Sequence, residues 1–163
     1  MITSPLGRRV CCLCMGLMAF SAFAADPVSG HQPLQIWDDE ARNNLPAWVQ
    51  VWLTILKLAI LPSVFFAWKY VEARWVLASI VAGVTFSNLI APQLGLLPLA
   101  GLTSLTHVIF WTPAIVVLIK NRPFMQGFSL YNAWAAFMLA CMLFSFVFDI
   151  PDAWTYLGYQ LQT

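Results

Sequence analysis

The sequence is poor in charged residues. Only 9% of its 163 residues are Asp, Glu, Lys or Arg, whereas 61% are hydrophobic. A soluble domain carries about 25% charged residues, which keep its surface in water. The shortage of charge therefore excludes an ordinary soluble domain and predicts an integral membrane protein, with the lipid bilayer as its first partner.

Basic clusters and nucleotide-binding motifs are also missing. The formal net charge is +1, and no basic stretch is longer than the pair Arg8-Arg9. A nucleic-acid-binding protein needs a patch or stripe of Lys and Arg, so we expect no nucleic-acid partner. The chain also lacks a Gly-rich phosphate loop, an internal repeat and a second domain.

Cysteine is scarce outside the N-terminus. Three of the four cysteines are Cys11, Cys12 and Cys14, which leaves Cys141 alone in the rest of the chain. One cysteine forms no intrachain disulfide and no cysteine-based metal site. We expect Cys141 to be a small buried apolar residue.

The N-terminal 24 residues have the pattern of a secretory signal peptide. Arg8 and Arg9 precede an apolar run over 10–20, and small residues at 22–24 permit cleavage after Ala24. The apolar run is shorter than the ~20 residues that a transmembrane helix needs. The sequence therefore predicts a cleavable signal peptide at 1–24. The alternative is an uncleaved helix that stays in the membrane.

The remainder predicts an all-α fold, an integral membrane bundle of four transmembrane helices. A polar external segment at 25–46 comes first and is too short to bury a core of its own. Four apolar runs of about bilayer-spanning length follow. The predicted transmembrane domain covers 47–150, and an external tail follows at 151–163. The four predicted spans are about 47–68, 75–91, 100–119 and 129–150.

The charges between these runs predict the orientation. Cytoplasmic loops of membrane proteins are enriched in Lys and Arg. Here the loops after the first and third runs hold Lys69, Arg74, Lys120 and Arg122, whereas six of the seven acidic residues lie on the other side. Together with the signal peptide, this predicts a multi-pass protein of the bacterial inner membrane, with both ends of the mature chain in the periplasm.

The first predicted span carries a polar stripe. Gln50, Thr54 and Lys57 are spaced i, i+4 and i+7, which places them on one helix face. Lys57 is about 15 Å from the end of the span, near the bilayer centre, where a charge costs about 2.5–3.5 kcal/mol. We expect it to face the bundle or a partner rather than lipid. A structural or interface role, a proton- or ligand-handling role and a misplaced or snorkelling lysine all remain open.

The second and third spans carry further polar or small residues. Ser79, Gly83 and Ser87 are four residues apart, which predicts a surface for close helix packing. Asn88 and His107 each lie within about 10 Å of the outer end of their span, and we expect them to be hydrogen-bonded neighbours. A single histidine supplies only one axial haem ligand, so we expect a packing role for His107, with no metal and no cofactor.

The chain offers no set of Ser, His and Asp and no pair of carboxylates at one predicted depth, so we expect it not to be an enzyme. The sequence favours a non-catalytic subunit, assembly factor or scaffold of a membrane complex, whose partners are other membrane subunits or further copies of the chain. The alternative is a small oligomeric transporter or channel with a polar path through Lys57, His107, Asn88 and Gln50. A cytochrome-like redox subunit that uses His107 is the remaining hypothesis.

Overall fold

The computed structural model describes residues 32–162, which form helices joined by short turns and contain no β-strand. Four helical segments are long and apolar enough to cross a membrane. The predicted all-α class and the four-span bundle are therefore confirmed for this part of the chain. The predicted signal peptide, 1–24, lies outside the described residues.

The second span is built from three consecutive helical segments, with a π-helical turn in the middle. The helices follow one another in this order: α2 (Asp39–Asn43), α3 (Ala47–Ala67), α4 (Val71–Thr85), the π-helix η1 (Phe86–Ile90), α5 (Ala91–Gln93), α6 (Ala100–Asn121), the 3₁₀ helix η2 (Pro123–Met125) and α7 (Leu130–Gln160).

Three of the four spans extend beyond their predicted limits, those of α4 and α7 by the most. α4 begins at Val71 rather than at residue 75. α7 passes through Pro151 and ends at Gln160, so most of the predicted tail, 151–163, is helix. A proline interrupts helical hydrogen bonding, but Ala153 and Tyr156 are buried. Their packing keeps the chain helical beyond the proline.

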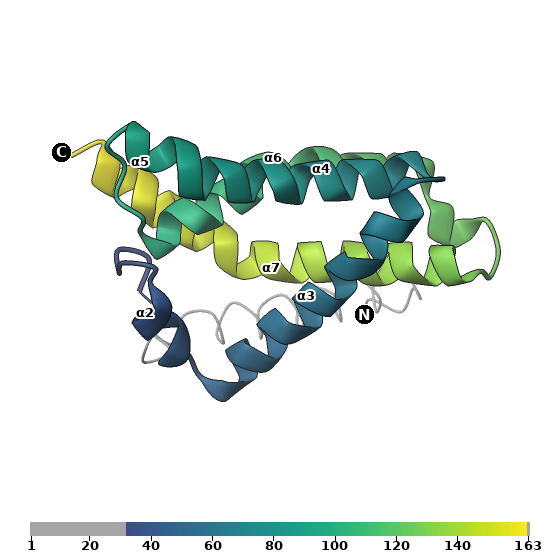
Figure 1. Cartoon of the computed structure of the whole chain (residues 1–163), viewed down its shortest axis with the longest axis horizontal. Coiled ribbons are helices and arrows are strands. Elements are labelled where there is room, and N and C mark those ends of the chain that lie inside the picture. Colours follow the sequence, from purple (N-terminus) through teal and green to yellow (C-terminus); the bar gives the residue numbers. More distant parts are fainter. Residues whose placement is uncertain (1–31, 163) are drawn as a thin grey trace, which may run out of the picture.

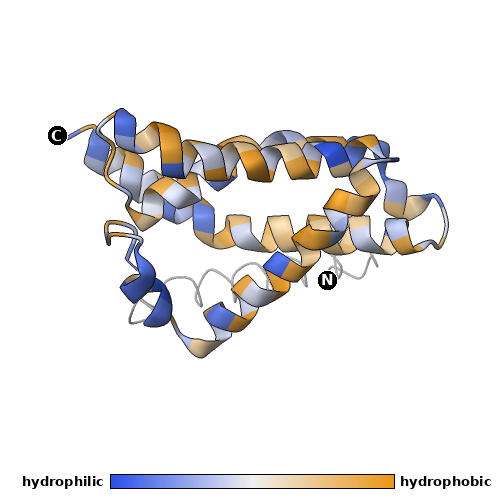
Figure 2. Ribbon diagram, in the orientation of Figure 1, coloured by the Kyte–Doolittle hydropathy of each residue, from blue (hydrophilic) through white to orange (hydrophobic). Residues whose placement is uncertain are grey.

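Three of the four spans form a compact bundle, and the first span, α3, diverges from it. α4, α6 and α7 run along the long axis, and α3 crosses them obliquely (Figure 1). α6 packs against both α4 and α7. We call the end at which α6 begins and α7 finishes the C-terminal end. Hydrophilic residues gather at the two ends of the molecule, and α3 carries some along its length (Figure 2).

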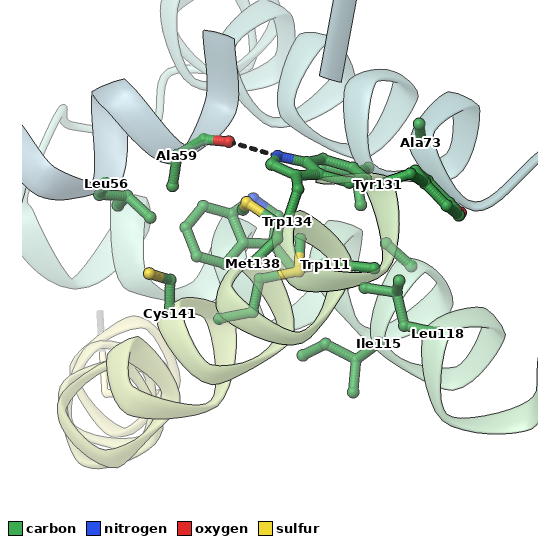
Figure 3. Close-up of a cluster of buried hydrophobic side chains, with 14 residues drawn as sticks. Leu56, Ala59, Ala73, Trp111, Ile115, Leu118, Tyr131, Trp134, Met138 and Cys141 are labelled. Carbon is green, nitrogen blue, oxygen red and sulfur yellow. Dashed lines mark hydrogen bonds between the residues drawn. The ribbon is translucent and has the colours of Figure 1, made fainter. Parts of the chain in front are cut away.

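The main core lies between α6 and α7 and extends to α4 and α3. Trp111 and Leu118 on α6 pack with Met138 and Met142 on α7, and all four are buried (Figure 3). One hydrogen bond ties α3 to this core. The indole Nε1 of Trp134 on α7 donates to the carbonyl oxygen of Ala59 on α3, at 2.8 Å.

Trp134→Phe removes this hydrogen bond and keeps most of the aromatic packing. We expect the free energy of unfolding to fall by about 1–3 kcal/mol, because a hydrogen bond is lost between buried groups and the smaller ring fills less of the core. Unfolding in mixed detergent–SDS micelles measures the change. Trp154→Phe is the control, since Trp154 is 78% exposed. Equal effects of the two substitutions would contradict the role of the Trp134 contact.

At the C-terminal end, the polar segment before α3 lies across the start of α6. The backbone N–H of Ala100 donates to the Gln35 carbonyl at 2.9 Å, and that of Gly101 donates to the Pro33 carbonyl at 2.7 Å. These bonds satisfy N–H groups that have no partner inside a helix at its first turn. The predicted external segment is thus attached to the bundle by its backbone.

Gly101 lies where α6, α7 and the polar segment before α3 come closest together. A Cβ added there would lie 2.6 Å from the Cβ of Tyr156 and 3.0 Å from the carbonyl oxygens of both Asp152 and Pro33. Real Cβ atoms essentially never come within 3.0 Å of another heavy atom. The absence of a side chain at this position allows α6, α7 and the polar segment to meet.

Candidate functional site

The polar stripe on α3 contains two hydrogen-bonded residues and one, Lys57, that has no partner among residues 32–162. Gln50 Nε2 donates to the Leu45 carbonyl at 2.9 Å and more weakly to that of Asn43 at 3.3 Å. The hydroxyl of Thr54 donates to the Gln50 carbonyl at 2.9 Å. Both side chains therefore donate hydrogen bonds to backbone carbonyls, Thr54 within α3 and Gln50 in the turn before it.

Lys57 is exposed and lies ten residues from each end of the 21-residue helix α3. Within residues 32–162, it has no hydrogen bond and no ion pair. α3 turns Leu56, Ala59 and Ser63 toward the rest of the molecule, and Lys57 points away from that face. Of the two predicted orientations, the one toward the bundle is wrong for this chain, and the one toward a partner remains.

Two of the small residues of the second span, Gly83 on α4 and Ser87 on η1, lie at its contact with α6. Ser79 and Gly83 are buried, and a Cβ on Gly83 would lie 3.9 Å from the Phe110 ring. The hydroxyl of Ser87 shares a hydrogen bond of 3.1 Å with that of Thr106 on α6. These positions pack two spans together within the chain.

His107 pairs with Asp149 and not with Asn88. Its Nδ1 lies 3.1 Å from Asp149 Oδ2, and its ring stacks on Trp111 at a centroid distance of 4.2 Å. Asn88 is exposed, and its Nδ2 donates to the Val84 carbonyl at 2.9 Å. The predicted hydrogen bond between His107 and Asn88 is wrong, because each residue has a different partner.

The length of α7 explains this error. A fourth span that ended at residue 150 would place Asp149 at the membrane boundary. α7 instead continues ten residues further, to Gln160, so Asp149 lies about 17 Å before the end of the helix. At that position it lies beside His107.

A double-mutant cycle tests the pair. His107→Ala and Asp149→Ala are expected to show a coupling free energy of about 1–2 kcal/mol, since residues in direct contact couple by 0.5–3 kcal/mol. Unfolding in mixed micelles provides the four required values. The cycle of His107→Ala with Asn88→Ala is the matched control, with expected coupling below about 0.5 kcal/mol. Larger coupling in the control than in the pair would contradict the geometry.

The opposite end of the bundle contains a polar network that the sequence analysis did not identify. Glu72 on α4 is buried. Its Oε1 accepts a hydrogen bond from Asn121 Nδ2, and its Oε2 accepts one from the Tyr131 hydroxyl, both at 2.7 Å. The Tyr131 ring stacks on Tyr70 at a centroid distance of 3.5 Å. This network joins α4, α6 and α7.

Glu72 was missed because the predicted second span began at residue 75, which placed it in a loop between basic residues. The sequence does contain one indication that Glu72 belongs to the helix, because it lies only three residues before an apolar run. At such a position, a carboxylate can enter the first turn of a helix, where the helix dipole stabilises it.

No metal centre is evident in the described part of the chain. Residues 32–162 contain no group of three or more His, Cys, Asp or Glu side chains that could hold a metal ion. Cys141 is a free thiol and is buried in the main core, in the same cluster as Leu56 and Met138.

No protein-family model, no curated protein and no solved structure matches the chain.

Proposed function

We propose that the protein is a non-catalytic subunit, assembly factor or scaffold of a membrane complex, and that α3 is the helix through which it binds its partner. The exposure of α3 carries this proposal. Only 17% of the most apolar stretch of α3 is buried, against 22% for the second span and 39% for the spans that contain α6 and α7, so α3 is the least buried of the four. α3 also diverges from the bundle toward α2 (Figure 1).

Exposure to lipid is ordinary for an apolar helix face, so the chemistry of the exposed residues matters. The face of α3 that points away from the bundle includes Lys57. A charged side chain at the bilayer centre is costly and generally faces protein or water. A second membrane protein seated on α3 would remove the lysine from lipid, and this requirement favours a subunit over an isolated protein.

We place this complex in the bacterial inner membrane, with the C-terminal end of the bundle in the periplasm. Four basic residues support this orientation, because Lys69, Arg74, Lys120 and Arg122 all lie in or beside the two turns at the opposite end. A C-terminal alkaline phosphatase fusion should be active, since that enzyme folds only after export. An active cytoplasmic reporter at the same position would reverse the orientation.

Extraction in a mild detergent tests the proposed function. The full chain, expressed in its own host and solubilised from native membranes, is expected to migrate in native electrophoresis as a defined assembly that contains another membrane protein. Migration only as a detergent-bound monomer would contradict the proposal.

The transport alternative has less support. A polar path needs its side chains to adjoin one another, but no hydrogen bond or ion pair in residues 32–162 joins any two of Lys57, His107, Asn88 and Gln50. Gln50 binds backbone carbonyls next to α3, and Asn88 binds the backbone of its own helix.

A further inference from the structure

We infer that Lys57 forms an ion pair with an Asp or Glu side chain in a transmembrane helix of a different protein. This inference rests on the proposed function and names the chemistry of the partner. α3 would be the interface helix, and Lys57 would provide its central polar contact.

The position of Lys57 disfavours a lipid phosphate as its counter-ion. Ten residues separate it from either end of α3, which corresponds to about 15 Å of helix in each direction. The hydrocarbon core of a bilayer is about 30 Å thick, so Lys57 lies near its centre. Its four-carbon side chain covers only part of the distance to the headgroups, and a carboxylate at the same depth neutralises the charge directly.

The acidic residues in the spans of this chain are already bound. Glu72 accepts hydrogen bonds from Asn121 and Tyr131, Asp149 pairs with His107, and Asp152 of α7 is not free either. Each would lose these partners if it turned to a lysine of another copy. The carboxylate for Lys57 is therefore expected to come from another protein.

Charge also disfavours a symmetric pair of copies on this face. A two-fold interface places the same surface of each subunit against the other. Such an interface through the centre of α3 would bring two Lys57 side chains together in a medium of low dielectric constant, where like charges repel strongly. An acidic helix from a different protein has the complementary charge.

A hydrophobic carbodiimide provides a direct test. This reagent enters membranes, activates a carboxyl group and couples it to an adjacent amine as an amide, with loss of the carboxyl oxygen to the urea by-product. Dicyclohexylcarbodiimide added to native membranes that contain the full chain is expected to give one cross-linked product, located by peptide mass spectrometry. The product should join Lys57 to an Asp or Glu within an apolar span of a different protein.

Three variants complete the experiment. Lys57→Met should abolish the cross-link and reduce the assembly in native electrophoresis at least tenfold. Lys57→Arg should retain most of the assembly, because it keeps the positive charge. Leu61→Met is the matched control, since Leu61 lies one turn away and is 59% exposed, and it should leave both the assembly and the cross-link intact.

The possible failures are distinguishable. An unchanged assembly in Lys57→Met would overturn the ion pair and leave the proposed subunit role standing. A cross-link from Lys57 to Asp26 of the same chain or to an acid of a second copy would likewise overturn the inference. So would the absence of any cross-linked product of Lys57. Absence of any assembly in the wild type would overturn both proposals.

Discussion

Gly101→Ala is expected to lower the free energy of unfolding by about 1–3 kcal/mol, the usual cost of forcing an extra methyl group into a packed site. The added Cβ would lie 2.6 Å from the Cβ of Tyr156 and 3.0 Å from two backbone carbonyl oxygens. None of these atoms is the flexible end of a side chain, so α6, α7 and the polar segment must separate. Unfolding in mixed detergent–SDS micelles measures the loss, and limited proteolysis near residue 33 should become faster.

Gly158→Ala is the matched control. Gly158 lies in the last turns of α7, and a Cβ there would meet no atom within 4 Å. Alanine is favoured over glycine in a helix by about 1 kcal/mol, so this variant should be as stable as the wild type or more stable. We therefore expect Gly101→Ala to lower the free energy of unfolding and Gly158→Ala to leave it unchanged or raise it. Equal destabilisation of the two variants would contradict the close approach at Gly101.

Glu72→Ala is expected to destabilise the bundle by about 1–3 kcal/mol. The substitution removes the acceptor for both the Tyr131 hydroxyl and the Asn121 amide. The loss leaves the buried Tyr131 hydroxyl without its acceptor, which costs about 1–3 kcal/mol, whereas the exposed Asn121 amide can bond to water. The loss should appear in the same micelle unfolding assay and in a lower yield of folded protein.

Two further variants separate the network from a general effect of charge. Glu72→Gln retains an oxygen that accepts from Tyr131 but loses the acceptor for Asn121, so its effect should be about half as large. Asp39→Ala removes the carboxylate of an exposed ion pair with Arg42 and should change stability little, as surface pairs generally do. A Glu72→Ala variant as stable as Asp39→Ala would show that the network is dispensable.

The positions of the spans were predictable from sequence because the bilayer imposes a length and an apolar composition on each one. α3 and α6 begin at Ala47 and Ala100, the predicted residues. The ends of α4 and α7 were less predictable. Proline and acidic residues ordinarily mark the end of an apolar helix, but the packing of Tyr156 near Gly101 keeps α7 helical through Pro151.

The polar partners were less predictable than the spans, because they depend on helix register. An error of ten residues at the end of α7 was enough to assign His107 to Asn88 rather than to Asp149. Similarly, helical spacing placed Gln50, Thr54 and Lys57 on one face but did not show which way that face points. Its direction depends on which apolar residues of α3 bury most area, and those are Leu56 and Ala59.

The unequal lengths of the spans affect how the protein fits its bilayer. α3 has 21 residues, about 32 Å of helix, which matches the hydrocarbon thickness of about 30 Å. α7 has 31 residues, about 46 Å, and exceeds that thickness whether upright or moderately tilted. In a thicker bilayer α7 is still long enough to cross the hydrocarbon core, whereas α3 is not. Hydrophobic mismatch at α3 then costs a fraction of a kcal/mol per Å. The helix that we assign to partner binding is thus also the one most sensitive to membrane thickness.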